Sequence, residues 1–315
     1  MIVGLTGASG FLGKALRRQL ISDGHSVIAW TSRPKVPSEN PPDQSWESAR
    51  PLKATSVETE WRHGTLGCAE DAAAFVHGCD AVIHAGLSRT GKSFLDVGEN
   101  VEAYWHRNVT GSLQLLEAAN SAGVQRFVFV SSGAVHDIVV PDHPLDETHP
   151  ARPKTLYGAY KASVESLVHH YGSLGTMVTA TLRPTAIYGL ADPPESSRWW
   201  SLVQDVAGGK SVTATGGSKC VHVEDVASGC RRLLRHDGVE SGSTYNCCDA
   251  MFSDYRVAEI TGELLDRPVK LFGAPKQAKH QIITERLESL GMQFGGEPLL
   301  RETIRAMLPK QSGTA

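Results

Sequence analysis

Tyr157 and Lys161 lie four residues apart in the segment Tyr157-Gly-Ala-Tyr-Lys161, a spacing that brings a phenol and an ammonium group to one face of a helix. We expect that helix over residues 159–170. Ionising a tyrosine at neutral pH costs about 4 kcal/mol, and a fixed positive charge nearby offsets much of that cost. The pair therefore predicts a tyrosine that exchanges protons with a substrate, although the same spacing also occurs at ordinary exposed helix starts.

The amino-terminal segment predicts a turn that binds phosphate. Residues 2–6 form an apolar run typical of a buried strand, residues 14–22 have a helical pattern, and Gly7, Gly10 and Gly13 lie around the turn between them. Glycine lets the backbone turn sharply and approach a pyrophosphate, and free N–H groups at a helix start favour an anion. The spacing is G-x-x-G-x-x-G, which differs from the G-x-G-x-x-G of the standard dinucleotide fingerprint. A tight turn without a ligand is the alternative interpretation.

Ser132 is the third candidate, because it ends an apolar strand expected over residues 126–132. Ligands gather at the carboxyl ends of the strands in an open parallel sheet. Ser132 would then be placed to hydrogen-bond a substrate oxygen. By itself the residue would favour a structural role, since serines at strand ends commonly form turns.

Taken together, these residues resemble the short-chain dehydrogenase/reductase superfamily, and specifically its extended branch, the NAD-dependent epimerase/dehydratase family. The resemblance covers most of the chain and rests on several motifs in a fixed order. These motifs are Thr6-Gly-Ala-Ser-Gly-Phe-Leu-Gly13, Asp80-Ala-Val-Ile-His-Ala-Gly86, Asn108-Val-Thr-Gly-Ser-Leu-Gln-Leu-Leu-Glu-Ala-Ala119, Arg183-Pro-Thr-Ala-Ile-Tyr-Gly189, Val221-His-Val-Glu-Asp-Val-Ala227 and Thr244-Tyr-Asn246.

Strand and helix signals alternate through residue 182, which favours an α/β fold with a doubly wound, Rossmann-like parallel sheet. We expect residues 1–190 to form the NAD(P)-binding domain and residues 191–315 a smaller, carboxyl-terminal substrate-binding lobe, with segments of the chain returning to the main sheet. The polar segment 34–60 interrupts the alternation. We interpret it as a surface insertion, with a lid over the adenine end of the cofactor as the alternative.

The resemblance implies a Ser-Tyr-Lys active site. Tyr157 would exchange a proton with the substrate, Lys161 would lower the Tyr157 pKa and bind the nicotinamide ribose, and Ser132 would polarise the reacting oxygen. Asn108 would hold the active-site helix or a water molecule. The implied cofactor-binding residues are Gly7, Ser9, Gly10, Phe11, Leu12, Gly13, Thr31, Ser32, Arg33, Thr65, Leu66, Ala85, Gly86, Tyr157, Lys161 and Pro184.

The choice of cofactor depends on the end of the second expected strand, which reads Thr31-Ser-Arg33. NAD users usually carry a carboxylate there, which binds the ribose hydroxyls. Thr31 removes a charge that would repel a 2′-phosphate, and the Arg33 guanidinium could pair with that phosphate. We therefore expect NADP to be preferred, with NAD as the alternative if Arg33 is only a solvated side chain. Thr65 is a second departure, because many relatives have an aspartate there that holds the adenine.

The residues after Ser132 bear on the outcome of the reaction. Sugar-nucleotide dehydratases of the family place an Asp-Glu pair there, whereas this chain has Gly133 and Ala134, so dehydration is disfavoured. His136 lies where many epimerases have a tyrosine, and it either contacts substrate or faces solvent.

Two features further along the chain bear on the substrate. Lys219 replaces an arginine that often meets the diphosphate of nucleotide sugars, and Trp199 and Trp200 either stack on a substrate ring or pack internally. The resemblance implies an NAD(P)-dependent epimerase or reductase acting on a sugar nucleotide or another small carbonyl or alcohol. The alternative is a non-catalytic NADP-binding sensor, although such proteins typically lose the tyrosine or the lysine.

Composition limits the partners. A formal net charge of -3, from 31 basic and 34 acidic residues, leaves no basic field for nucleic acid. We expect a cytoplasmic protein, because no apolar stretch reaches the length of a membrane span and the first strand starts too early for a signal peptide. The six cysteines form no C-x-x-C pair, so we expect buried thiols without metal or disulfides. The resemblance also implies a homodimer that pairs through the helices around Asn108 and Tyr157.

Overall fold

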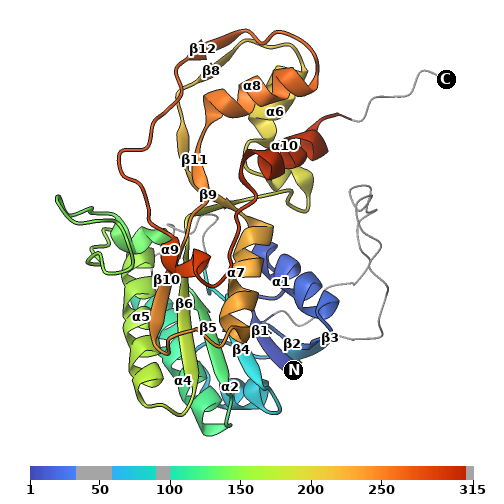
Figure 1. Cartoon of the computed structure of the whole chain (residues 1–315). Helices are drawn as coiled ribbons and strands as arrows, with labels where there is room; N and C mark the ends of the chain where they lie inside the picture. The colour runs from blue at the N-terminus through green and yellow to red at the C-terminus, as the bar shows by residue number, and fades with distance from the viewer. Residues whose placement is uncertain (33–58, 90–99, 310–315) are drawn as a thin grey trace. The chain divides into compact units, whose positions relative to one another are not determined.

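The computed structural model describes residues 1–32, 59–89 and 100–309 (Figure 1). The chain forms two compact units. Unit 1 comprises residues 1–184, 226–247 and 282–292, and unit 2 comprises residues 185–225, 248–281 and 293–315.

Unit 1 is built on a seven-stranded sheet in the order β10-β6-β5-β4-β1-β2-β3. Every neighbouring pair is parallel, so the predicted doubly wound parallel sheet is confirmed. Because all strands run the same way, their carboxyl ends share one edge. The strands are β1 (Ile2–Thr6), β2 (Ser26–Thr31), β3 (Thr59–His63), β4 (Ala81–His84), β5 (Arg126–Val130), β6 (Val178–Pro184) and β10 (Ser243–Cys247).

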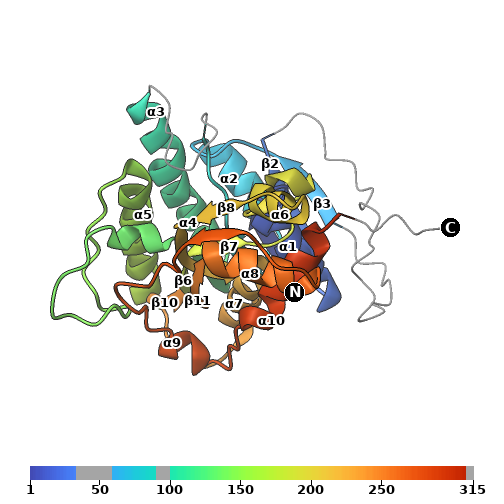
Figure 2. The ribbon, with the colours of Figure 1, turned by 90° about the horizontal axis from the view of Figure 1, so that it is seen from above.

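Helices cover both faces of this sheet. The core on one face packs the sheet against α2, α4 and α5, whereas α1 and α7 lie together on the other face (Figure 2). Arg231 of α7 joins these last two helices, because its guanidinium donates to Asp23, the residue after α1. The elements are α1 (Phe11–Ser22), α2 (Ala69–Val76), α3 (Val101–Trp105), η1 (His106–Thr110), α4 (Gly111–Ser121), η2 (Gly133–His136), α5 (Leu156–Ser173), α7 (Val223–Arg235) and α9 (Glu285–Glu288).

Unit 2 has a three-stranded sheet in the order β11-β9-β7 and a separate parallel pair, β12 and β8. Its main core packs Tyr188, Val203, Phe252, Ile260 and Leu300 between the sheet and the helices. The elements are β7 (Ala186–Tyr188), η3 (Pro194–Ser196), α6 (Trp200–Ala207), β8 (Val212–Ala214), β9 (Gly217–His222), β11 (Ala250–Ser253), α8 (Asp254–Leu264), β12 (Leu271–Gly273) and α10 (Gly296–Met307).

Helix α5 begins earlier than predicted. The expected range was 159–170, but the helix starts at Leu156, directly after Thr155. The Thr155 hydroxyl accepts a hydrogen bond from the backbone N–H of Gly158 at 3.1 Å, which is the standard action of a threonine N-cap. Tyr157 therefore lies in the first turn, where the helix itself fixes its direction relative to Lys161.

The part of the chain that the structure describes has neither a membrane-spanning helix nor a cluster of metal-binding side chains. None of its helices is long and apolar enough to cross a membrane. It contains no group of three or more histidine, cysteine, aspartate or glutamate side chains that could hold a metal ion. Five of the six cysteines are buried, and Cys68 is half-buried.

Candidate active site

Lys161 attaches α5 to the carboxyl end of β5. Its ammonium group donates to the carbonyl oxygen of Val130, the last residue of β5, at 2.7 Å, and to the Tyr160 hydroxyl at 3.3 Å. Ser132 lies two residues beyond Val130, so the same contact brings the start of α5 to the segment that carries Ser132.

Tyr157 and Ser132 lie near each other at this point, close enough for the Ser132 side chain to affect the pKa of the Tyr157 phenol. The Ser132 hydroxyl also accepts from the backbone N–H of Ala134 at 3.2 Å, which starts the short helix η2. Burial raises the pKa of Tyr157 above its ordinary value, and the neighbouring Ser132 side chain lowers it in part. Desolvation alone would make this phenol a weak acid, so it needs a positive charge nearby to ionise.

Lys161 places an amino group near this phenol. Its ammonium nitrogen lies 5.7 Å from the centre of the Tyr157 ring and 4.6 Å and 4.7 Å from the ring centres of Phe129 and Tyr160. Burial lowers the pKa of Lys161 to about 7, while the Glu165 carboxylate opposes this shift. The structure therefore brings Ser132, Tyr157 and Lys161 together. A phenol flanked by a hydroxyl donor and a cation can hand a proton to a substrate oxygen or take one from it.

Asn108 is fully buried in the π-helical turn η1. Its amide nitrogen donates to the carbonyl oxygens of Ser88 and Tyr104, both at 2.9 Å, and its amide oxygen accepts from the Ser88 backbone N–H at 2.9 Å. These bonds tie the segment after β4 to the start of α4. Asn108 thus holds the backbone of Ser88 and Tyr104 in place.

His84 is a buried polar residue that the sequence did not single out. Its Nδ1 lies 2.7 Å from the Thr6 hydroxyl, and its Nε2 lies 2.9 Å from the Ser112 hydroxyl. The Ser112 hydroxyl donates its one proton to the Asn108 carbonyl oxygen, so it accepts from Nε2, which carries the ring proton, and the Thr6 hydroxyl donates to Nδ1. Burial and the charge on Lys161 lower the pKa of His84 to about 3. This neutral ring joins the ends of β1 and β4 to α4.

The glycine-rich turn brings backbone segments of unit 1 very close together. A Cβ added to Gly13 would lie 2.1 Å from the Gly7 carbonyl oxygen, and one added to Gly7, whose φ is +72°, would lie 2.7 Å from the Ala85 carbonyl oxygen. Gly10 is the N-cap of α1, and no side chain caps this helix or places an acid in its first turn. Its first N–H groups can therefore meet an anion, as a pyrophosphate requires. These residues fit a dinucleotide at the point where the strand order reverses between β1 and β4.

The remaining cofactor candidates lie at or near the carboxyl edge of the same sheet. Thr31 is buried at the end of β2 and Ser32 is exposed, while Arg33 lies outside the described residues. Thr65 donates its backbone N–H to the Asp71 carboxylate at 2.8 Å. Other candidates of this group occupy the start of α1 (Ser9, Phe11, Leu12), the turn after β3 (Leu66), the segment after β4 (Ala85, Gly86) and the end of β6 (Pro184).

Tyr104 and Tyr160 are further residues near the site that sequence reasoning missed. Tyr160 is fully buried and accepts from Lys161, as described above. The Tyr104 hydroxyl is buried and has no hydrogen-bond partner among the described residues. Burial, together with Tyr157, raises the pKa of Tyr104 to about 12. The only available signal for Tyr160 was its place within the Tyr157–Lys161 motif.

Three residues of unit 2 had open interpretations. Trp199 donates its ring N–H to Asp254 at 2.9 Å and packs with Trp200 against the unit 2 core, which favours a packing role. Lys219 is half-buried, and burial lowers its pKa. His222 lies 5.0 Å from Tyr188 between ring centres and 3.2 Å from the Thr303 hydroxyl, within the unit 2 core.

Comparison with known proteins gives matches along most of the chain. The model of the NAD dependent epimerase/dehydratase family matches residues 3–248. The chain is 31% identical over 253 residues to 4-hydroxy-2-methyl-3-oxo-4-farnesyl-3,4-dihydroquinoline-1-oxide ketoreductase of Stigmatella aurantiaca, which is 78% of this chain and 67% of that protein. It is 27% identical over 255 residues to UDP-glucuronate 4-epimerase 1 of Arabidopsis thaliana, which is 76% of this chain and 56% of that protein.

A third relative, the 3-beta-hydroxysteroid dehydrogenase of Mycolicibacterium neoaurum, is 34% identical over 199 residues, with 60% of this chain and 48% of that protein covered. The chain therefore spans about half to two thirds of the length of these relatives.

Solved structures share the fold. The UDP-glucose 4-epimerase of Thermus thermophilus, in complex with NAD, superposes with a TM-score of 0.72 at 23% identity and covers 98% of this chain and 99% of its own. The UDP-glucose 4-epimerase of Thermotoga maritima, with UDP-glucose, gives a TM-score of 0.74 at 19% identity, with 97% and 98% covered.

Proposed function

The chain belongs to the NAD dependent epimerase/dehydratase family, a family of enzymes, and we propose on this basis that it transfers a hydride between a nicotinamide cofactor and a carbonyl or hydroxyl group of a small molecule. The catalytic residues of this proposal are Ser132, Tyr157 and Lys161, with Asn108 in a supporting role. The observation that carries it is the place of the Lys161 nitrogen, which lies 5.7 Å from the Tyr157 ring centre and 2.7 Å from the carbonyl oxygen of Val130, two residues before Ser132.

A bound nicotinamide cofactor would supply or accept the hydride, and the protein handles the proton. In reduction, the Tyr157 hydroxyl gives its proton to the substrate oxygen, and the Lys161 ammonium stabilises the phenolate that remains. Ser132 donates a second hydrogen bond to the same oxygen, which favours the charge that develops there. In oxidation, the Tyr157 phenolate takes the proton back. Asn108 keeps the segment before α4 in place, so these side chains stay aligned with the glycine-rich turn.

The substrate class we propose is a nucleotide sugar or another small carbonyl or alcohol, converted by epimerisation or by net reduction or oxidation. The relatives include a ketoreductase, a UDP-glucuronate 4-epimerase and a steroid dehydrogenase, so both outcomes occur among proteins similar to this one. Gly133 and Ala134 occupy the positions where dehydratases carry their acidic pair, which argues against elimination of water.

NADP is the cofactor we propose as preferred, with NAD as the alternative. Thr31, at the end of β2, carries no charge that would repel a 2′-phosphate, and Arg33 could pair with that phosphate. The test is to titrate the purified protein with NADPH and NADH separately, follow the quenching of tryptophan fluorescence, and repeat with Arg33→Ala. Tighter binding of NADPH, lost in the variant, would support the preference. Equal or tighter binding of NADH would overturn it.

Catalysis by Tyr157 is tested with Tyr157→Phe. We expect turnover of any active carbonyl or UDP-sugar substrate to fall about 10²- to 10⁴-fold, because the proton donor is lost. The variant should keep its affinity for NADH and NADPH, measured by the same fluorescence titration. If the cofactor binds and Tyr157→Phe leaves every turnover unchanged, a non-catalytic sensor on this scaffold becomes the better explanation.

We also propose that the protein is a homodimer that pairs through α4 and α5. Leu113 of α4 is a large apolar side chain that remains 39% exposed within a single chain. Its apolar surface supports an interface at this helix.

A further inference from the structure

A buried ion pair joins α5 to β6 close to the candidate catalytic residues. Arg183 donates from Nη2 to Glu165 Oε2 at 2.7 Å and from Nε to Glu165 Oε1 at 3.0 Å. The two side chains are only 7% and 8% exposed. Desolvation of two charges offsets most of their mutual attraction, so such a pair contributes little net stability to a fold. Its position suggests a different role.

Glu165 also connects to the end of β5. One of its carboxylate oxygens accepts from the Ser131 hydroxyl, and Lys161 donates to the carbonyl oxygen of Val130. Two consecutive residues at the end of β5 are thus bound by two side chains that lie one helical turn apart on α5. The next residue of the chain is Ser132. Together, the ion pair and the Lys161 hydrogen bond fix the position of α5 relative to the segment that carries Ser132.

Glu165 has an electrostatic effect on Lys161 as well. It is the only acidic residue of α5, and it lies one turn from Lys161 on the same helix. The other groups near the Lys161 nitrogen are the rings of Phe129, Tyr157 and Tyr160, which carry no charge, and His84, which burial keeps neutral. The carboxylate of Glu165 raises the pKa of Lys161 against the lowering by burial. Without it, the buried amine would lose its proton more readily.

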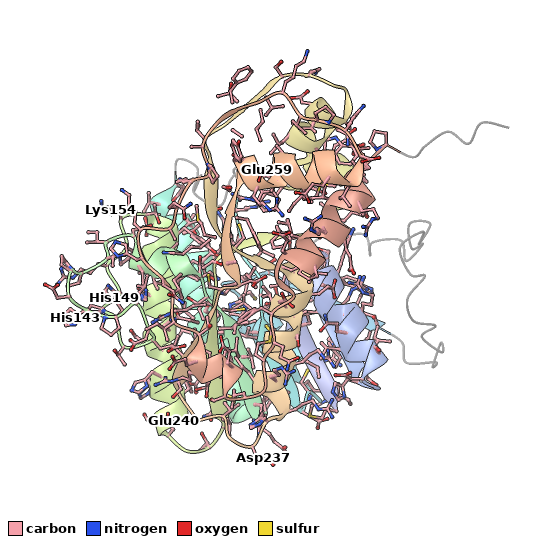
Figure 3. All side chains as sticks on the ribbon, turned by 45° about the horizontal axis from the view of Figure 1, so that its top comes forward. His143, His149, Lys154, Asp237, Glu240 and Glu259 are labelled. Carbon is pink, nitrogen blue, oxygen red and sulfur yellow. The ribbon has the colours of Figure 1, made fainter. Side chains whose placement is uncertain are left out.

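His136 is a further titratable residue beside this ion pair. Its Nε2 lies 3.2 Å from Arg183 Nη1, which can only donate, so the ring proton is on Nδ1. Burial and the Arg183 charge lower the pKa of His136 to about 4. The neighbouring His149, labelled in Figure 3, has a ring centre 5.2 Å away and accepts the Val140 N–H at its Nε2. His136 is therefore neutral in this arrangement and does not compete with Arg183 for Glu165.

We propose that Glu165, held by Arg183, is a positioning residue of the candidate active site: it anchors Ser131 directly before Ser132 and supplies the counter-charge that keeps the Lys161 ammonium protonated beside Tyr157. This inference rests on the proposed function, because it assigns a role to Lys161 in proton exchange. It adds Glu165 to the residues of that function, as a residue that acts through Ser131 and Lys161.

The test follows the titration of Lys161 directly and needs neither cofactor nor substrate. The full chain is labelled with ¹³C at the lysine Cε, and the Lys161 signal is assigned by its absence in Lys161→Met. We expect its titration midpoint to fall by about one pH unit in Glu165→Gln, because an opposite charge nearby shifts a pKa by about this amount or more. Glu165→Gln keeps the size of the side chain and removes only its charge.

Asp23→Asn is the matched control. It removes the carboxylate of another arginine pair in unit 1, with Arg231, at the end of α1 that lies away from the glycine-rich turn. The Lys161 midpoint should stay unchanged in this variant. An equal fall in Asp23→Asn would overturn the proposal, since a carboxylate elsewhere in unit 1 would then affect Lys161 as much as Glu165 does. An unmoved midpoint in Glu165→Gln would overturn it as well.

A second variant covers the case in which Glu165→Gln does not fold, since it leaves Arg183 buried without its partner. The double variant Glu165→Gln, Arg183→Met removes both charges, and replacement of a buried pair by neutral groups is often tolerated. The Lys161 midpoint should fall in it too, and an unchanged midpoint would refute the role of Glu165. The proposed function fails separately if the unaltered protein binds neither NADH nor NADPH, whereas a falling midpoint would still establish the coupling between Glu165 and Lys161.

Discussion

His84 illustrates how the chemistry of single residues in unit 1 depends on burial. The ring is fully buried between the hydroxyls of Thr6 and Ser112, so it accepts one hydrogen bond and donates the other only while it is neutral. A second proton would break the bond from Thr6 and place a charge in the core, close to Lys161. The pKa of about 3 expresses that cost.

This residue makes the stability of the fold sensitive to acid. In the unfolded chain His84 binds a proton below about pH 6.5, whereas in the folded chain it does so only near pH 3. Between these values the unfolded state holds the extra proton, so the free energy of unfolding falls as the pH falls, by up to about 1.4 kcal/mol per pH unit from this group. Urea unfolding at a series of pH values measures the slope.

His84→Gln is the variant that tests this assignment. Its amide nitrogen can replace the Nε2 donor to Ser112, but the side chain does not titrate. Between about pH 6.5 and 4, the free energy of unfolding should change less steeply with pH in this variant than in the unaltered protein. The difference in slope is the contribution of one histidine. A slope equal to that of the unaltered protein would show that other groups cause the acid sensitivity.

Among the secondary-structure elements, the glycine-rich turn and α1 depend on the close approach of two backbone segments. Gly13 lies in the first turn of α1, and its missing side chain leaves room for the carbonyl of Gly7. The obstacle that a Cβ would meet is backbone and not the end of a flexible side chain. Any side chain at Gly13 must therefore shift the turn that we propose holds the cofactor phosphates.

We expect Gly13→Ala to weaken the binding of NADH or NADPH at least tenfold and to destabilise unit 1 by about 1–3 kcal/mol through overpacking. Gly123→Ala provides a control, because its φ is +74° and nothing lies within 4 Å of an added Cβ. That change should lower the free energy of unfolding by about 1–2 kcal/mol, because of backbone strain, and leave cofactor affinity intact. Equal cofactor affinity in the two variants would count against a phosphate-binding turn.

For the molecule as a whole, some large apolar side chains stay exposed in a single chain. Val101 and Trp105 of α3 and Leu113 of α4 are 53%, 36% and 39% exposed, and they belong to neighbouring stretches of the sequence. Burying such side chains against a second copy would gain about 25 cal/mol per Å² of apolar area. This gain is the physical basis for the homodimer that we propose.

Light scattering at micromolar protein tests the dimer. We expect the unaltered chain to have about twice the mass of one chain and Leu113→Glu to shift it towards a monomer, because a charge at the centre of the interface would be buried without a partner. Phe272→Glu is the matched control, since Phe272 is 61% exposed but belongs to β12 of unit 2 and not to α4 or α5. A monomer in the unaltered protein would refute the dimer.

The fold class, the family and the local motifs could be predicted from the amino-acid sequence. Residues close in the chain, such as the glycines of the first turn or Tyr157 and Lys161 on one helix, take their relative positions from local geometry, which spacing alone predicts. The resemblance to the epimerase/dehydratase family is confirmed by the family model over residues 3–248. The start of α5 was misplaced by three residues, because the N-cap at Thr155 was not recognised.

The partners of the buried polar groups became known only from the folded chain. Glu165 pairs with Arg183, and His84 lies between Thr6 and Ser112, because strand order and helix packing bring together residues that are far apart in the chain. His136 had two predicted roles, contact with substrate or exposure to solvent, and the structure gives it a third, as a partner of Arg183. Spacing within one element cannot show such pairs, since each depends on which strand lies beside which.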